Sequence, residues 1–136
     1  MDYAFGLLKP DCLRRGLERE IMLIIGANGL PTIASKRVRL TKKEVDIVWP
    51  NCINEPYYPS MLAFSTSSDC LAFIVTGDDA ISRLHELVGH YDPAKARPDT
   101  IRGRYATSCM ENLIHSADTV EDFWLQTRLF FTINFT

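Results

Sequence analysis

The stretch YAFGLLKPDCLRRGLEREIMLIIGANG, residues 3–29, contains the change of pattern that decides the fold class. It opens with a short apolar run that ends at Lys9-Pro10, which is typical of a buried strand terminated by proline. Apolar residues then recur at helical spacing from Leu17 to Ile25, with charged residues between them and Gly26 as a stop. The stretch therefore predicts a strand followed by an amphipathic helix.

The same alternation continues along the chain. Residues 32–40 are rich in β-branched side chains and residues 70–75 form a second apolar run, so both segments are expected to be strands. Pro50 and the segment 56–59 are expected to break regular structure between them. The order of strand, helix, strand, helix, strand and helix predicts an α+β sandwich with helices on an antiparallel sheet.

Three helix starts carry capping residues. Thr41 and Glu44 match a capping box, in which each side chain reaches a free backbone N–H. Asp78 or Asp79 is expected to cap a helix that runs through Leu87. A last amphipathic helix is expected to begin at Asp118 or Thr119 and to end at about Phe130.

Composition limits the possible classes of protein. The 136 residues are 46% hydrophobic and 24% charged, without internal repeats, which predicts one compact domain over residues 1–136. The net charge of −2 is spread along the chain and gives no general reason to expect a nucleic-acid or membrane partner. The longest apolar run, Ile21–Ile25, is too short to cross a bilayer, and the first residues do not match a secretion signal, so we expect a cytoplasmic protein.

Four cysteines are widely spaced and form no Cys-x-x-Cys pair, which indicates free thiols in a reducing compartment rather than a zinc site: Cys12, Cys52, Cys70 and Cys109.

Two segments are candidates for function. Residues 89–100, GHYDPAKARPDT, contain two prolines and no periodicity, and such a long excursion within a compact domain favours a functional loop. His115 follows the apolar pair Leu113 and Ile114 in NLIHSAD, residues 112–118. It is either a packing residue satisfied by a hydrogen bond or a nucleophile or acid/base group, and other residues must decide between the two.

Four stretches, in this order and at these separations, resemble the nucleoside diphosphate kinases: LLKPDCLRRGL (7–17), PYYP (56–59), DPAKARPDTIRG (92–103) and ENLIHSADTVE (111–121). The resemblance extends from Tyr3 to Phe131, so the chain is identified as a divergent member of this family. It implies a ferredoxin-like βαββαβ sandwich, with a four-stranded antiparallel sheet covered by helices. It also implies a homo-oligomer built from dimers, with tetramer and hexamer both open.

The resemblance implies a specific chemistry. The family moves the γ-phosphate of a nucleoside triphosphate onto a histidine and then onto a nucleoside diphosphate, in a ping-pong reaction, and the matching residue is His115. Lys9 and Arg102 match the residues that contact the phosphates, and Asn112 matches one that contacts the sugar. Mg²⁺ is expected to arrive bound to the nucleotide, with few or no direct protein ligands and no metal cage made of protein side chains.

The remaining site residues are also assigned by the resemblance. Tyr57 matches the aromatic residue that stacks on the base, Cys109 matches the small apolar residue opposite it, and Met61 belongs to the same nucleotide site. His85 stands where an arginine, and Tyr91 where a threonine, normally contacts the phosphates.

Several positions depart from the family pattern. Gln126 replaces the glutamate that orients the imidazole, so it accepts a hydrogen bond but supplies no charge. Trp49 replaces a tyrosine near the histidine, Ala117 a serine, and Cys12 a glycine. Together with His85 and Tyr91, these changes predict slower turnover or weaker nucleotide affinity.

Two alternatives follow from these departures and from the fold class. One is a catalytically weak or inactive kinase-like module that binds nucleotide or acts in assembly or regulation. The other is a ferredoxin-like module that binds single-stranded nucleic acid on its sheet, which would require a basic, aromatic strand face that is not apparent here.

Overall fold

The computed structural model describes residues 2–132. Its helices and strands follow one another in this order: β1 (Asp2–Leu8), α1 (Pro10–Arg14), α2 (Glu18–Ala27), β2 (Thr32–Val38), α3 (Lys42–Val48), the 3-10 turn η1 (Pro50–Cys52), α4 (Tyr58–Ser65), β3 (Cys70–Gly77), α5 (Ala80–Val88), α6 (Ile101–Tyr105), β4 (Ile114–Ser116) and α7 (Val120–Thr127).

The four strands form one sheet in the order β2-β3-β1-β4, and each neighbouring pair is antiparallel. β1 is therefore central and pairs with both β3 and β4. Its register places Leu7 opposite His115, near the end of β1 that leads into Lys9. The topology thus brings the candidate histidine beside the candidate lysine, although they are far apart in sequence.

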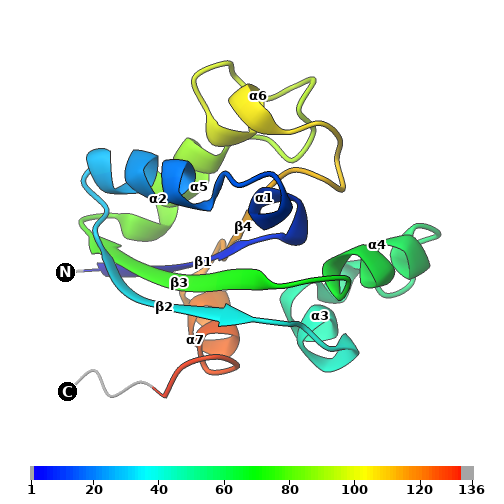
Figure 1. The fold of residues 1–136 in the computed structure, drawn as a ribbon. Helices are drawn as coiled ribbons and strands as arrows, with labels where there is room; N and C mark the ends of the chain where they lie inside the picture. Colours follow the sequence, from blue (N-terminus) through cyan, green and yellow to red (C-terminus); the bar gives the residue numbers. More distant parts are fainter. Residues whose placement is uncertain (1, 133–136) are drawn as a thin grey trace.

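Side chains of β1 alternate between two hydrophobic cores, as the period of a strand requires. Ala4 and Leu8 belong to the core between the sheet and helices α2 and α5, whereas Phe5 and Leu7 belong to the core on the α3 and α7 side. Figure 1 shows the sheet between these two helical layers. Since helices cover both faces within residues 2–132, the sheet offers no open face for single-stranded nucleic acid.

The expected ferredoxin-like α+β sandwich is confirmed, and the helix starts correct some details. Thr119, rather than Asp118, caps α7, because its Oγ1 accepts the N–H of Asp122 at 3.0 Å. Asp79 precedes α5 but has a left-handed backbone with φ of 52°, and its side chain makes no capping bond. Its N–H instead donates to Asp2 Oδ2 at 2.9 Å, so the first residue of β1 holds the turn that precedes α5.

The predicted capping box at the start of α3 does not form the expected side-chain to backbone hydrogen bonds. Thr41 is the N-cap residue, but its hydroxyl is hydrogen-bonded to the Glu44 carboxylate and not to the backbone. The two side chains satisfy each other on the exposed surface, so the free N–H groups of this helix end are left to solvent.

The prolines act differently from the prediction in one respect. Pro10 and Pro59 lie in the first turn of α1 and α4, where proline lacks only an N–H that would have no helical partner. β1 ends at Leu8, so the predicted stop at Lys9-Pro10 is confirmed, and Pro10 and Pro59 in addition begin short helices. At the other end of the chain, α7 stops at Thr127, before the predicted Phe130, and the chain continues in hydrogen-bonded turns.

All four cysteines are free thiols. Within the described residues, none of the helices has the length and apolar character needed to span a membrane.

Candidate active site

The Lys-Pro-Asp turn after β1 holds the backbone that leads to His115. The N–H of Lys9 donates to the Leu113 carbonyl at 2.8 Å, and Asp11 Oδ2 accepts the Leu113 N–H at 3.1 Å. Lys9 Nζ donates to Asn112 Oδ1 at 2.9 Å and to the Met110 carbonyl at 2.7 Å. Two motifs from opposite ends of the chain are thus one hydrogen-bonded unit.

Leu113 is strained within this unit. Its φ of 76° lies in the left-handed region that residues with a branched side chain rarely adopt. Asp11 is buried, and burial raises the pKa of its carboxyl while Lys9 opposes that rise. A buried acceptor for the Leu113 N–H therefore helps to keep the unusual turn, which sets the direction in which β4 starts.

His115 is half-buried on β4, and two side chains contact its ring. Its Nε2 lies 2.8 Å from Oε1 of the buried Gln126 on α7. Its ring also meets the edge of Trp49, with centroids 5.2 Å apart and planes at 68°. When Gln126 Oε1 accepts, Nε2 carries the proton and Nδ1 keeps its lone pair.

The imidazole is held neutral. Burial, followed by the nearby positive charges of Arg102 and Lys9, lowers the pKa of His115 to about 4, although the Gln126 hydrogen bond acts in the opposite direction. Burial likewise lowers the pKa of Lys9 to about 8, so that this lysine still carries its charge at neutral pH. A neutral nitrogen nucleophile beside positive charge is therefore the state of the site near pH 7.

Arg102 on α6 joins the loop after α5 to β4. Its Nη1 donates to the Gly89 carbonyl at 3.0 Å and its Nη2 to the Ile114 carbonyl at 2.6 Å. Its buried Nε has no partner among the residues that the structure describes. Burial lowers the pKa of Arg102 to about 10, which leaves the guanidinium charged and directly behind the histidine backbone.

A pocket of about 980 Å³ opens in front of these groups. Five of the residues predicted for the site line it: His85, Tyr91, Arg102, His115 and Gln126. Five others do not belong to its lining: Lys9, Tyr57, Met61, Cys109 and Asn112.

Lys9 and Asn112 lie buried behind the pocket wall. The Lys9 ammonium is 5.8 Å from the centroid of Trp49, which itself lines the pocket and contacts His115. Asn112 Nδ2 donates to the Tyr91 carbonyl at 3.1 Å and the Cys109 carbonyl at 3.0 Å. These two residues therefore support the pocket and connect its loops, while the Lys9 charge acts on the site from one layer behind.

The remaining three predicted residues lie outside the pocket lining. Tyr57 is 49% exposed beside α4, and its hydroxyl donates to Cys52 Sγ at 3.5 Å. Since Cys52 lines the pocket, Tyr57 stands next to its edge. Met61 is half-buried on α4 against the core, and Cys109 is exposed in the segment before β4.

The positions that depart from the family pattern have visible structural consequences. His85 Nδ1 lies 2.9 Å from Asp118 Oδ1, so this ring nitrogen is already paired with a carboxylate. Tyr91 is exposed and stacks on His90 with centroids 4.6 Å apart. Ala117 is buried in the core on the α7 side, where a serine hydroxyl would need a partner.

Trp49 lines the pocket beside His115, where it was expected, but sequence reasoning missed four other lining residues: Lys95, Arg97, Asp118 and Asp122. Lys95 and Arg97 belong to the 89–100 loop, and their positive charge within a predicted functional loop was the available signal. The two aspartates had no such signal, because they follow His115 in a segment that was interpreted as a helix cap. Within residues 2–132, no group of three or more His, Cys, Asp or Glu side chains is placed to hold a metal ion.

Comparisons with known proteins identify the family of the chain. A family model described as nucleoside diphosphate kinase matches residues 2–134. A nucleoside diphosphate kinase of Oleidesulfovibrio alaskensis is 34% identical over 128 residues, which cover 94% of this chain and 92% of the relative. One from Methanocorpusculum labreanum is 34% identical over 132 residues, covering 97% and 89%.

Solved structures show the same likeness. The apo nucleoside diphosphate kinase of Encephalitozoon cuniculi superposes with a TM-score of 0.92 at 31% identity, covering 96% of this chain and 88% of that one. The enzyme of Halobacterium salinarum in complex with CDP superposes with a TM-score of 0.89 at 29% identity, covering 96% and 87%. The chain therefore belongs to the nucleoside diphosphate kinase family.

Proposed function

We propose that this nucleoside diphosphate kinase, a phosphotransferase, transfers the γ-phosphate through a phosphohistidine on His115. The observation that carries the proposal is the neutral His115 ring, which faces a pocket with its Nε2 tied to Gln126 and with Arg102 and Lys9 close by. The CDP bound to the Halobacterium salinarum relative supports nucleoside phosphates as the ligands of the pocket.

The proposed step uses the atom that remains free. The Nδ1 lone pair attacks the γ-phosphorus, the bond from that phosphorus to the bridging oxygen breaks, and the nucleoside diphosphate leaves with the electron pair. The proton on Nε2 stays in its hydrogen bond to Gln126, so the phosphorylated ring becomes cationic. In the second half-reaction, a diphosphate oxygen attacks the phosphohistidine and the neutral imidazole is restored.

We infer that Mg²⁺ enters with the nucleotide phosphates and would offset part of their charge when bound. The pocket offers hard oxygen donors of the type that Mg²⁺ accepts, with the Asp122 carboxylate on its wall. Asp118 also lines the pocket, but its Oδ1 is already paired with His85 Nδ1. Asp122 is therefore the side chain we expect to face such an ion.

Turnover is proposed to be slower than in members that keep a glutamate at position 126. The phosphorylated ring is cationic, and a carboxylate on Nε2 would stabilise that charge, whereas the Gln126 amide offers only a dipole. An amide can also rotate and present its NH₂ group, which would favour the wrong tautomer of His115.

Gln126→Glu is accordingly expected to raise the rate of His115 phosphorylation about tenfold, in line with the loss or gain of one charge-assisted hydrogen bond. The new carboxylate should also raise the pKa of His115 above its present value of about 4. Rapid-quench measurement of phosphoenzyme formation tests the rate, and NMR titration of the ring tests the pKa. Gln126→Met serves as the matched variant without a hydrogen bond, and a rate that does not rise from Met through Gln to Glu would contradict the role given to this residue.

The pH dependence of kcat/KM should have a plateau that ends on the alkaline side. His115 is neutral above a pH of about 4, since its pKa is lowered to that value, and Lys9 loses its charge as the pH rises through about 8. Activity is therefore expected to stay level from about pH 5 to 7 and to fall above about 8. In Lys9→Arg the charge persists at high pH, so the alkaline decline should move upward; an unchanged decline would exclude Lys9 as its source.

The direct test is a labelling experiment. The protein is incubated with Mg²⁺ and ATP labelled in the γ-phosphate, separated from nucleotide, and then mixed with unlabelled CDP. We expect acid-labile, base-stable label on the protein and its transfer to CTP. A protein that binds ADP but takes up no label would instead be the inactive nucleotide-binding or regulatory module, the alternative favoured by Gln126 and by the His85–Asp118 pair.

Assembly and location complete the proposal. We propose a homo-oligomer built from dimers, because β2 is an edge strand and carries the exposed side chain of Ile33. Light scattering after size exclusion distinguishes dimer, tetramer and hexamer. We place the protein in the cytoplasm, where nucleotides are abundant and its four free thiols would stay reduced.

A further inference from the structure

The basic side chains that line the pocket differ in whether their charge is already used. Arg102 donates to two backbone carbonyls, and His85 is paired with Asp118 at 2.9 Å. Arg97 Nε lies 3.4 Å from Asp99 Oδ1. Lys95 lines the same pocket, and its ammonium has no side-chain partner in the part of the chain that the structure describes.

The pocket also contains negative charge, from Glu86, Asp118 and Asp122. A nucleoside triphosphate carries several negative charges into this space. Its binding therefore requires positive charge that offsets the phosphates and the carboxylates of the pocket. His85 occupies the position of an expected arginine, yet even its protonated form would be offset by the Asp118 carboxylate. The phosphates therefore lack a cation at the place where the family resemblance leads one to expect it.

The loop that carries Lys95 is held by its own hydrogen bonds. The Asp92 carbonyl accepts the N–H of Lys95 at 2.9 Å and of Ala96 at 3.0 Å, and Asp92 Oδ1 accepts the N–H of Ala94 at 3.0 Å. The N–H of Asp92 donates to His90 Nδ1 at 3.0 Å. This turn fixes the backbone of Lys95 beside the pocket, while its long flexible stem leaves the ammonium free to reach a ligand.

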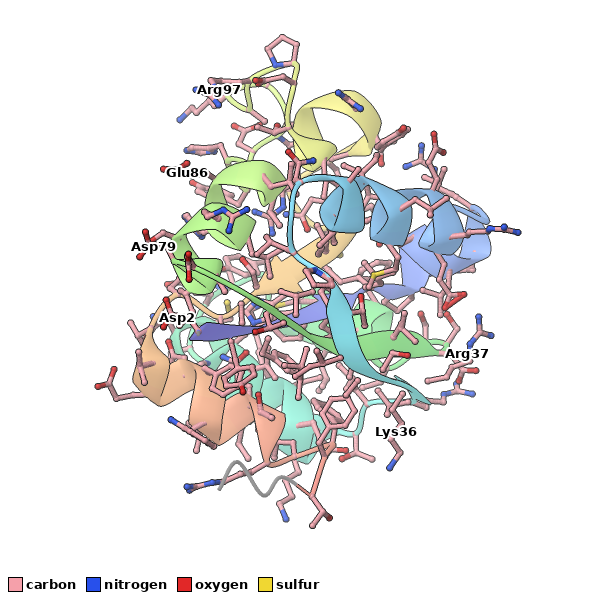
Figure 2. The ribbon with its side chains drawn as sticks, turned by 90° about the vertical axis from the view of Figure 1, so that its left-hand side faces the viewer. Asp2, Lys36, Arg37, Asp79, Glu86 and Arg97 are labelled. Carbon is pink, nitrogen blue, oxygen red and sulfur yellow. The ribbon has the colours of Figure 1, made fainter. Side chains whose placement is uncertain are left out.

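We propose that Lys95 binds the phosphate groups of the nucleotide and supplies the charge that His85 does not. The inference rests on the proposed function, since it assigns a specificity residue to the same site. Arg97 is the less suitable cation, because it is paired with Asp99 and also borders a second hollow on the other side of the loop. Figure 2 shows Arg97 at the outer end of the molecule, on the same side as Glu86.

The test compares Lys95→Ala with Lys43→Ala, which removes an exposed lysine of α3 that does not line the pocket. Titration with Mg·ADP is expected to give a Kd raised about three- to tenfold for Lys95→Ala and unchanged for Lys43→Ala. Binding of adenosine should be equal in all three proteins, because it has no phosphate. Lys95→Arg should restore most of the affinity, and the salt dependence of ADP binding should be weaker in Lys95→Ala than in the wild type.

Two results would overturn the inference. One is an ADP affinity of Lys95→Ala equal to that of Lys43→Ala. The other is an equal loss for adenosine and ADP, which would mean that the loop is disturbed and not that a phosphate contact is lost. Because binding is measured without turnover, a wild type that binds ADP but forms no phosphohistidine would refute the proposed function alone, and the Lys95 comparison would still decide this inference.

Discussion

Replacement of His115 by alanine is expected to remove the phosphoenzyme entirely and to lower the transferase rate by a factor on the order of 10⁴ or more, because no other group replaces a covalent nucleophile. The fold should survive, since His115 is half-buried and its side chain makes one hydrogen bond, to Gln126. Label from γ-labelled ATP, measured after alkaline gel separation, gives the result directly. Retained binding of ADP shows that the pocket is intact.

The chain offers a matched control, because two other histidines also line the pocket. His90 is exposed and its Nδ1 accepts the N–H of Asp92, so His90→Ala removes an imidazole without touching the β4 site. His90→Ala should keep full labelling. If His115→Ala still takes up acid-labile phosphate while His90→Ala labels as the wild type does, the nucleophile is not His115.

Long elements with a clear period were predictable from the sequence. β1, α2, β2, β3 and α5 each contain enough residues for an apolar pattern to emerge, and their predicted ranges lie within a few residues of the observed ones. The five-residue helices α1 and α6 and the three-residue strand β4 are too short for any period. They form because tertiary contacts hold them: β4, for instance, pairs with β1 through Leu7 and His115.

The candidate site divides in the same way. Resemblance placed Lys9, Asn112 and His115 in one site, and the hydrogen bonds between the Lys-Pro-Asp turn and residues 112–113 show why these motifs occur together. The sequence could not show that Lys9 lies outside the pocket lining, with its ammonium 5.8 Å from the ring centroid of the pocket-lining Trp49. That position depends on how α3 and α4 pack against β1, which no local pattern specifies.

The altered positions illustrate a second limit. Substitution of arginine by His85 can be read from the sequence as a loss of charge, but the partner that offsets any remaining charge is Asp118, on a different element. The positive charge of Lys95 is equally visible in the sequence, but its place in the pocket lining is known only from the structure. Whether one charge can replace another depends on where the two side chains lie in space, and a single sequence does not give those positions.

Lys9→Met is expected to lower kcat/KM by about 10²–10³, the range for loss of one group that stabilises charge in a transition state. Methionine fills the same buried volume, but the positive charge disappears from behind Trp49 and His115. A second readout follows from the sign of the electrostatic effect. Because Lys9 contributes to lowering the pKa of His115, its removal should raise that pKa and shift the acid limb of the pH profile to higher pH.

Stability has to be separated from catalysis in this variant. Lys9 donates to the buried Asn112 Oδ1 and the partly buried Met110 carbonyl. Leaving these acceptors unpaired costs about 1–3 kcal/mol, partly offset because a buried charge is no longer desolvated. Two variants serve as controls. Lys9→Arg keeps the positive charge at the site, and Lys43→Met makes the same substitution at an exposed lysine of α3. Urea unfolding and kinetics on all three decide the matter: if Lys9→Met is folded and retains kcat/KM within about threefold of wild type, the charge one layer behind the pocket does not act on the phosphate.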